Sequence, residues 1–365
     1  MINRYAAFLI ISFCFFSTLN IQAQKKPGHT SKTPKAYHGG HLFESDDILH
    51  FKLTGKLNDL YKDISDKNSF HPVLLQYLQK DSTPVSINMM VKTRGHFRRI
   101  KGNCDMPPLL LQFPKDHQIK NTLFDYQNNL KLIVPCRGDD YVINEWLVYK
   151  MYNLLSDKSF KARLVQVDFE DSLKRKKTET HYCILLEDAK KMAERNHCFI
   201  LKKKMLDMRK TNLKEFEKMA VFQYMIGNTD WGVPYLQNIV LITKDSSQAP
   251  TAVPYDFDHA GIVGASYAGP APELEIASTR DRLYRGFCES DMQNFAETFD
   301  LYNHLKSDIY KVYTDCPLLN SRYIKVTSKF LDDFYKTINN NRAIQSEFGL
   351  PCRTNTRVEI KGLKD

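Results

Sequence analysis

The sequence lacks several patterns that define common classes of enzymes. No two cysteines are spaced as Cys-x-x-Cys, so neither a zinc ribbon nor a thioredoxin-type site is indicated. The absence of a His-Glu-x-x-His string and of a Gly-x-Ser-x-Gly string disfavours zinc proteases and α/β-hydrolases. A Walker A string and a glycine-rich phosphate loop are also missing. Any chemistry must therefore come from other polar residues.

Long apolar runs are missing too, apart from one near the start. Residues 6–16 are almost wholly apolar, follow the positive Arg4, and form a run shorter than the ~20 residues that span a bilayer. Ala23 is a small residue suited to cleavage before Gln24. We therefore expect a signal peptide at residues 1–23, with an uncleaved anchor as the alternative. Its removal leaves no transmembrane span, and export places the protein in the periplasm, outside the cell or at the cell surface.

The cysteines that follow this segment are odd in number. Seven of the 8 cysteines remain, so at least one lacks an intramolecular partner even where disulfides form. They are Cys104, Cys136, Cys183, Cys198, Cys288, Cys316 and Cys352. For most of them we expect buried free thiols.

Positive charge is abundant but scattered. The formal net charge is +10, from 52 Lys and Arg against 42 Asp and Glu, which suits acidic ligands in general. Two basic runs, Lys174–Lys177 and Lys202–Lys204, are not interleaved with aromatic residues that could stack on bases. Nucleic-acid binding is therefore not favoured.

The composition indicates a folded globule. Hydrophobic residues make up 42% of the 365 residues and charged residues 26%, enough apolar surface for a substantial core. One unit with two lobes and a cleft could contain nearly the whole chain.

The first half of the chain is rich in strand patterns. Five stretches are apolar or alternating and are bounded by turn residues, which predicts strands; they are residues 85–93, 109–113, 130–134, 162–169 and 180–186. Residues 141–155 have helical spacing, with Asp139–Asp140 as the expected cap. The order of elements is therefore β-β-β-α-β-β.

The second half is mainly helical. Helices are expected at residues 212–226, 295–312 and 321–338, and short strands at 239–243 and 251–253. We divide the chain accordingly into a flexible leader (24–41), a β-rich lobe (42–188) and a mostly helical lobe (189–365).

Three types of polar residue in the second half occur in an order that suits phosphoryl transfer. That reaction needs a carboxylate to orient or deprotonate the attacking oxygen, an asparagine on a divalent metal, and an aspartate between metal and phosphates. Asp230 follows a helix, Asn238 leads into a strand, and Asp256 with Asp258 follows the next strand. A helix-terminal turn at Asp230 and a capped loop at the aspartate pair are the structural alternatives.

The segment between Asp230 and Asn238 is longer than the catalytic loop of protein kinases, and Gln237 precedes the asparagine where a histidine often stands. The extra residues, which include Trp231 and Pro234, either bulge outward and leave Asn238 correctly placed or indicate a degraded site.

Two strings carry a family resemblance. Ile226-Gly227-Asn228-Thr229-Asp230 with Gln237-Asn238, and Val253-Pro254-Tyr255-Asp256-Phe257-Asp258, resemble HipA-like and spore-coat-protein-H-like (CotH-like) atypical kinases. The resemblance extends over roughly residues 85–265. It implies an α+β, bilobal protein-kinase-like fold, with a β-rich N-lobe containing one main helix and a mainly helical C-lobe.

The same resemblance implies ATP with Mg or Mn, and phosphorylation of a Ser, Thr or Tyr hydroxyl of an acceptor protein. Asp230 would be the catalytic carboxylate, with Asn238 and Asp256 on the metal. Asp258 is added from its spacing, because residues two apart share a face of an extended backbone and both carboxylates could approach one metal. Two alternatives remain open: an inactive pseudokinase or surface interaction protein, and an enzyme that transfers AMP.

The phosphate-binding residues are less sharply defined. Lys131 is the first choice because it lies in a short apolar strand before the helix that carries Glu145, and Lys115 is the second. Arg94, beside Gly95, could contact phosphate or simply belong to a turn before a solvated basic patch, Arg98–Arg99. Arg280, Arg282 and Arg285 could bind a phosphorylated or acidic substrate, but we favour a salt-bridged face of a helix for them. For His259, beside the metal aspartates, we expect a packed, neutral side chain rather than a ligand.

Overall fold

Seven strands from the first half of the chain form a closed barrel in the order β1–β2–β3–β4–β5–β7–β6. The computed structural model describes residues 40–95, 97–100, 102–115 and 119–353, which all belong to one compact unit. The barrel strands are β1 (Leu49–Gly55), β2 (His71–Leu78), β3 (Pro84–Thr93), β4 (Leu109–Gln112), β5 (Asn129–Ile133), β6 (Ala162–Asp171) and β7 (Glu179–Leu186).

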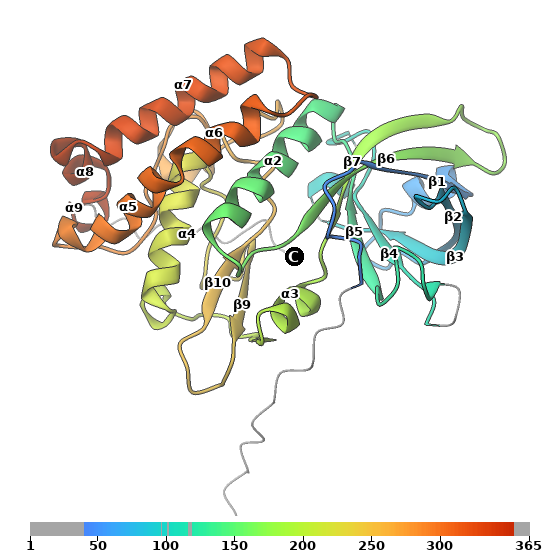
Figure 1. Cartoon of the computed structure of the whole chain (residues 1–365), viewed down its shortest axis with the longest axis horizontal. Helices are drawn as coiled ribbons and strands as arrows, with labels where there is room; N and C mark the ends of the chain where they lie inside the picture. Colours follow the sequence, from blue (N-terminus) through green and yellow to red (C-terminus); the bar gives the residue numbers. More distant parts are fainter. Residues whose placement is uncertain (1–39, 96, 101, 116–118, 354–365) are drawn as a thin grey trace, which may run out of the picture. The chain divides into compact units, whose positions relative to one another are not determined.

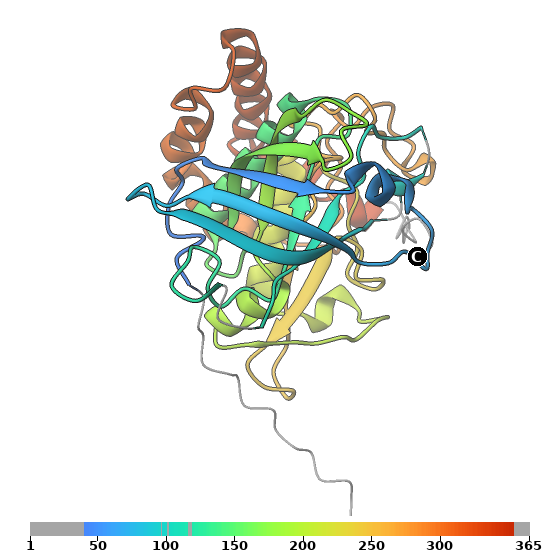
Figure 2. The same ribbon diagram turned by 90° about the vertical axis from the view of Figure 1, so that its right-hand side faces the viewer.

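Strand β1 closes the barrel by pairing on both sides. It runs antiparallel to β2, with Leu53 opposite Leu75, and parallel to β6, with Leu49 opposite Val165. Strands β1, β2 and β3 lie side by side in blue and cyan in Figure 2. Closure leaves none of the seven strands with an unpaired edge.

The barrel interior is filled by alternate residues of its strands, as the two-residue period of a strand requires. Phe51, Ile87, Leu111 and Leu132 are representative interior side chains, each almost fully buried. The ring of Phe124, from the loop between β4 and β5, stacks on Phe113 at a centroid distance of 5.0 Å. This interior is a hydrophobic core of its own.

The expectation of a bilobal protein-kinase-like fold is wrong. The β-rich part is a closed seven-stranded barrel rather than the sheet of a kinase N-lobe, although the mixed α+β content is as expected. The order predicted from the sequence lacked both β2 and β1, the strand that closes the barrel. Closure depends on pairing between β1 and β6, which lie more than a hundred residues apart.

A second hydrophobic core lies between the barrel and the helices. Helix α2 (Asp139–Leu155) packs against the outer face of β6 and β7 and against α4 (Leu213–Ile226). Figure 1 shows α2 in this position, with α4 and α6 beside it. The Asp139 carboxylate anchors the start of α2 to β7, because it accepts bonds from His181 Nδ1 at 2.9 Å and from the Tyr182 N–H at 3.0 Å.

The remaining elements build the helical part and a small sheet of order β10–β9–β8. They are α3 (Ala189–Arg195), β8 (Phe199–Ile200), β9 (Ile239–Thr243), β10 (Thr251–Pro254), α5 (Ala296–His304), α6 (Lys306–Thr314), α7 (Ser321–Ile338), α8 (Asn341–Glu347) and α9 (Leu350–Arg353). The short helix α1 (Leu57–Lys62) belongs to the barrel instead, where it packs against β3 and β6. Short 3-10 turns lie at Phe97–Arg99, Met208–Lys210, Pro272–Leu274 and Met292–Phe295.

Most predicted elements are confirmed within a few residues, and the exceptions have local causes. The helix expected at 295–312 is two helices that meet at Leu305. Asp139 and Asp140 form the first turn of α2 rather than its cap, which is Gly138. Among the described helices, none combines the length and the apolarity needed to cross a bilayer.

The expectation that most cysteines are free thiols is wrong. Cys104 bonds to Cys136, and Cys288 bonds to Cys352. Cys183, Cys198 and Cys316 are free, and the first two are buried. The predicted signal peptide and nearly all of the leader lie outside the described residues.

The barrel core gives a direct test of stability. Leu132 is 0% exposed and pairs with Leu109 and Leu185 on neighbouring strands. We expect Leu132→Ala to lower the free energy of unfolding by about 3 kcal/mol, because the interior cannot collapse onto the space that is left. Leu78→Ala, at a side chain 64% exposed on β2, should change it by less than about 0.5 kcal/mol. If the two substitutions lowered the free energy of unfolding equally in urea denaturation, the placement of Leu132 inside the barrel and Leu78 outside it would be contradicted.

Candidate functional site

The site begins where α4 ends. Gly227 adopts a left-handed conformation with φ +66°, which glycine supplies at low cost. A Cβ there would lie 2.8 Å from the Thr279 carbonyl oxygen, so a larger residue cannot be accommodated without movement. The buried Asn228 donates from Nδ2 to Gln223 Oε1 at 2.9 Å and accepts the Asp230 N–H at 3.0 Å. These bonds fix the turn that carries Asp230.

The long segment after Asp230 bulges outward and closes on itself. Gly232 and Gln237 exchange two backbone hydrogen bonds of 3.0 and 2.9 Å, which confine the extra residues to a protrusion. Asn238 returns beside Asp230, and its Nδ2 donates to the Asp230 carbonyl at 2.8 Å and to Oδ2 at 2.9 Å. Gln237 Nε2 donates to Oδ1 of the same carboxylate.

Asp230 is therefore oriented by two side-chain amides. Burial raises the pKa of the Asp230 carboxyl, and the charge of Asp258 adds to that rise. His259 and the two amide donors act in the opposite direction without cancelling it. A carboxylate with a raised pKa is a better proton acceptor than an ordinary aspartate.

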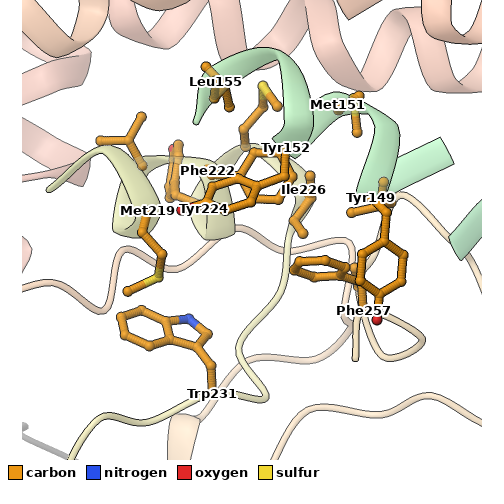
Figure 3. Packing of buried hydrophobic residues seen from close by; sticks show 14 of the residues in the cluster. Tyr149, Met151, Tyr152, Leu155, Met219, Phe222, Tyr224, Ile226, Trp231 and Phe257 are labelled. Atoms are coloured by element: carbon orange, nitrogen blue, oxygen red, sulfur yellow. The ribbon is translucent and has the colours of Figure 1, made fainter. Parts of the chain in front are cut away.

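Asp256 follows β10 in an unusual backbone conformation. Its φ is +62°, a region in which aspartate and asparagine are the commonest residues after glycine, and its N–H donates to Tyr149 Oη at 2.9 Å. The next side chain, Phe257, is buried, and its ring centroid lies 4.9 Å from that of Tyr149. Figure 3 shows the two rings side by side. The Tyr255 N–H also donates to the Asn238 carbonyl at 3.1 Å. Asp256 and Asn238 are thus held on adjoining segments.

Burial raises the pKa of Asp256, and the neighbouring Asp258 raises it further. Arg98, Arg94 and Lys131 oppose that rise in this order of strength. Three cationic side chains therefore act on this one carboxyl group.

Asp258, which was predicted to bind metal, accepts a hydrogen bond from arginine through Oδ2. Arg98 Nη2 donates to Asp258 Oδ2 at 2.9 Å, and both side chains are at most 10% exposed. Tyr267 Oη donates to the same oxygen at 3.2 Å. Burial disfavours the charge of Asp258, but Arg98 and then His259 outweigh it and hold the pKa of Asp258 below its usual range.

Arg98 was expected to lie in a solvated patch, and that expectation is wrong for this residue. Its guanidinium also donates to the Val134 carbonyl at 3.2 Å and to Tyr267 Oη at 2.9 Å. Burial disfavours its charge, yet Asp258 outweighs burial and raises the pKa of Arg98. Arg98 follows β3, so it links the barrel to the segment after β10.

Glu145 of α2 lies behind the two aspartates and is 1% exposed. Burial, followed by the charges of Asp258 and Asp256, raises the pKa of Glu145 well above its ordinary value. Arg98 and a hydrogen bond from the Phe257 N–H act in the opposite direction. Its Oε1 has no hydrogen-bond partner within the described residues.

Lys131 of β5 lies on the barrel side of the site. Its Nζ is 4.3 Å from the centroid of the Tyr255 ring. Burial, and then the charge of Arg94, lower the pKa of Lys131 to about 7, although Asp256 and Asp188 favour its charged form. In the part of the chain that the structure describes, Lys131 makes no ion pair with Glu145 or any other carboxylate.

Arg94 and Lys115 stand at opposite ends of β4. Arg94 donates its backbone N–H to the Pro108 carbonyl at 2.8 Å, just before β4 begins, and its charge acts on both Lys131 and Asp256. Lys115 is exposed in the loop after Gln112, where β4 ends. The structure therefore brings Arg94 and Lys131 together and leaves Lys115 apart.

Arg285 is a further residue of the site, and sequence reasoning assigned it wrongly. The stretch that contains Arg280, Arg282 and Arg285 is not a helix. Arg285 Nη1 donates to the carbonyls of Thr229 and Trp231, on either side of Asp230. Burial lowers the pKa of Arg285 to about 10, against the opposing effect of Asp230. No local pattern indicates such a role, because the contact crosses 54 residues.

The side chains suit a phosphate ligand that carries a divalent cation. At the site, the buried acceptor oxygens Glu145 Oε1 and Gln237 Oε1 lack partners among the described residues, although native structures satisfy most such atoms. No group of three or more His, Cys, Asp or Glu is arranged for a metal within those residues. Mg²⁺, however, typically takes one or two carboxylates together with phosphates and water, which Asp256 and the Asn238 amide oxygen could supply in part.

Comparisons with known proteins give little additional information. No family model matches the sequence, and no curated protein sequence matches it. Among solved structures, the chain is similar to a crystal structure of the Helicobacter pylori proinflammatory kinase CtkA, at 12% identity over 70% of this chain and 95% of that chain, with a TM-score of 0.39. At this TM-score the two chains share too little geometry to establish a common fold. The resemblance to CotH-like and HipA-like kinases receives no support from these comparisons.

The Arg98–Asp258 pair provides a test of the site's architecture. We expect Arg98→Met to lower the free energy of unfolding at neutral pH by about 3–5 kcal/mol, because it leaves a buried carboxylate without its partner. The double variant with Asp258→Asn should recover part of that loss. Lys214→Met, at a surface pair with Glu297 in which both side chains are more than 70% exposed, should cost less than about 1 kcal/mol. Additive effects of the two single substitutions in denaturant titrations would refute the coupling.

Proposed function

We propose that this chain is an ATP-dependent phosphotransferase that acts on a protein hydroxyl. The observation that carries the proposal is the convergence of Asp230, Asn238 and Asp256 from three successive segments, opposite Lys131 and Arg94 from the barrel. These are the residue types that phosphoryl transfer requires, and along the chain the catalytic carboxylate precedes the asparagine and the metal aspartate, as in protein kinases. The proposal rests on the site and not on the protein-kinase fold, which the barrel rules out.

Each residue has a role that follows from its surroundings. Asp230 accepts the proton of the attacking hydroxyl, because its pKa is raised and two amides orient its oxygens. Asp256 and the oxygen of the Asn238 amide would hold Mg²⁺ or Mn²⁺. Lys131 and Arg94 would bind phosphate oxygens. Asp258 is bound by Arg98, so we propose that it positions Arg98 and that its charge raises the pKa of Asp256.

The reaction balances without any further reactant. The acceptor oxygen forms a bond to the γ-phosphorus of ATP, the bond between that phosphorus and the β–γ bridging oxygen breaks, and ADP leaves. The hydroxyl proton passes to Asp230. A divalent cation held by Asp256 and Asn238 would supply positive charge to the phosphates.

Export is a separate proposal with its own support. Disulfides persist mainly in oxidising compartments, and the bonds Cys104–Cys136 and Cys288–Cys352 agree with the signal peptide expected at residues 1–23. We therefore propose that the protein works in the periplasm, outside the cell or at the cell surface.

Aspartate variants test the reaction. Purified mature protein, supplied with Mn-ATP that carries a labelled γ-phosphate, should label itself or an added protein. We expect Asp230→Asn to lower the rate by about 10²–10⁴-fold while nucleotide binding persists, because only proton acceptance is removed. Asp256→Asn should weaken metal-dependent nucleotide binding itself. Asp300→Asn, at an exposed position on α5, is the matched control.

Labelling by Asp230→Asn at the wild-type rate would exclude its catalytic role. Mass spectrometry of the product separates phosphate from AMP transfer, the alternative chemistry. Nucleotide binding without any transfer would indicate a pseudokinase, and the absence of a thermal shift with Mn-ATP would leave only an interaction protein.

The lowered pKa of Lys131 predicts that nucleotide binding depends on pH. Its pKa of about 7 means that it is charged below pH 7 and loses its charge above it. Phosphate favours the charged form, so binding above pH 7 must take up a proton. The dissociation constant of Mg-ATP should therefore rise with pH, by up to about tenfold per unit, until the pKa of the complex is reached.

Calorimetry in two buffers of different ionisation enthalpy measures this proton uptake directly. Lys131→Met should weaken binding at pH 7 and abolish the uptake between pH 7 and 9. Lys115→Met, at an exposed position beyond the other end of β4, should leave both unchanged. Uptake that persists in Lys131→Met would assign the titration to another group.

A further inference from the structure

Residues 278–288, which we call the strap, cross the two turns that carry the candidate site. The strap forms neither a helix nor a strand. A Cβ placed on Gly227, at the end of α4, would lie 2.8 Å from the Thr279 carbonyl oxygen, and a Cβ on Gly261 would lie 2.2 Å from it. Side chains do not tolerate approaches that close, so glycine at both turns makes room for the strap.

Two arginines of the strap bond to the backbone that it crosses. Arg282 Nε donates at 3.2 Å to the Met225 carbonyl, one of the last four carbonyls of α4, which have no partner within the helix. Arg285 Nη1 donates to the Thr229 carbonyl and, at 2.7 Å, to the Trp231 carbonyl. Hydrogen bonds from a charged donor are stronger than those between neutral groups. The strap thereby holds the end of α4 and the backbone on either side of the candidate catalytic carboxylate.

The strap and the loop after Asp230 also pack on the same helix. Phe287 stacks on Phe216 of α4 at a centroid distance of 5.3 Å, and the Trp231 ring lies 6.1 Å from that of Phe216. The guanidinium carbon of Arg285 is 5.5 Å from the centroid of the Trp231 ring. Aromatic neighbours therefore place Arg285 in addition to its hydrogen bonds.

A disulfide fastens the end of the strap. Cys288, its last residue, is bonded to Cys352 of α9, and both cysteines are exposed. Burial disfavours the charge of the Arg285 guanidinium, so water competes for this side chain. The bond at Cys288 limits how far the chain can carry Arg285 away, because three residues span at most about 10 Å. Exposure of both cysteines makes this covalent link open to reduction by thiols in solution.

We propose that Arg285 is a positioning residue for Asp230, and that the Cys288–Cys352 disulfide keeps Arg285 in place. The inference rests on the proposed function, which it deepens by naming a residue that orients the catalytic carboxylate and a bond that regulates it. When a dithiol reduces the disulfide, the S–S bond breaks, the dithiol supplies two electrons and two protons, and two thiols are left on the protein while the dithiol becomes a disulfide. Phosphoryl transfer should be fast with the disulfide formed and slow after its reduction.

Hydrogen exchange of the mature chain tests Arg285 without any transfer. The N–H groups of Asp230 and Gly232 are hydrogen-bonded within the loop and exchange when the loop opens. We expect Arg285→Met to speed this exchange by about tenfold or more, because bonds to a charged donor are lost. Arg163→Met is the matched control, because it removes a buried arginine that also donates to backbone carbonyls, but from β6 of the barrel. It should leave both N–H groups unchanged.

Kinetics with Mn-ATP test whether Arg285 acts through Asp230. Arg285→Met should lower kcat by about tenfold or more and leave KM for Mn-ATP nearly unchanged, because its two carbonyl partners flank Asp230 and not the proposed phosphate-binding residues. Arg285→Lys should recover part of kcat, since an ammonium can still donate to carbonyls. Equal changes of kcat in Arg285→Met and Arg163→Met would overturn the positioning role.

The disulfide is tested in a chain that carries Cys104→Ser/Cys136→Ser, which removes the other disulfide of the described residues. Dithiothreitol should lower kcat and speed exchange of the Asp230 N–H, each by about tenfold, and reoxidation should restore both. Cys288→Ser/Cys352→Ser should have the same low kcat, in this chain or alone, and no response to the dithiol. A response that persists without Cys288–Cys352, or none with it, would refute the role of the bond.

The outcomes separate the strap from the reaction. If exchange at Asp230 follows Arg285 and the disulfide but Mn-ATP gives no transfer, the proposed function fails and the hold of the strap on the loop stands. If transfer occurs and Arg285→Met changes neither exchange nor kcat, the positioning role fails and the proposed function stands.

Discussion

Arg98 extends from the loop after β3 to Asp258, 160 residues further along the chain, and both side chains are almost fully buried. A buried pair of this kind is costly to desolvate, so it is retained only where its geometry and its extra hydrogen bonds are good. Here Val134 and Tyr267 supply those bonds. The pair joins the barrel to the segment that carries Asp256. The position of Asp256 relative to Lys131 and Arg94 therefore depends on it.

The second constraint is the backbone around the end of α4. The left-handed turn at Gly227 accepts the Gly261 N–H on its carbonyl at 3.0 Å, and the Ile226 carbonyl accepts the Ile262 N–H at 3.0 Å. The segment after Asp256 is thereby bonded to the start of the segment before Asp230. Tyr149 of α2 adds a third support through the Asp256 N–H. Hydrogen bonds therefore join helix α4, the turn before Asp230 and the segment after Asp256, and such bonding is what a preorganised site requires.

Local patterns in the sequence predicted the parts of this site that are themselves local. The end of α4, the return of Asn238 and the turn after β10 each follow from a short string, and so Asp230, Asn238 and Asp256 were found. The roles of Arg98, Tyr267 and Arg285 come from contacts across many residues, which a single sequence does not encode as a motif. The same reason explains the fold: β1 and β2 have ordinary apolar patterns, and only the parallel pairing of β1 with β6 makes a barrel. The sequence did not decide the conformation of the segment between Asp230 and Asn238, because that conformation depends on a single backbone pairing, between Gly232 and Gln237.

The distribution of charge determines which side chains of the site are available to a ligand. Arg98 is committed to Asp258, so the cations left for a ligand are Lys131 and Arg94, both from the barrel. The oxygen donors left for a cation are Asp256 and the amide of Asn238, both from the helical part. Burial and the two aspartates favour the protonated form of Glu145, which limits the negative charge behind them. A ligand that carries both phosphate and a divalent cation would be bound from both sides, whereas phosphate alone or a cation alone would engage only one. This division of charge supports the proposed ligand, which combines phosphate with a divalent cation.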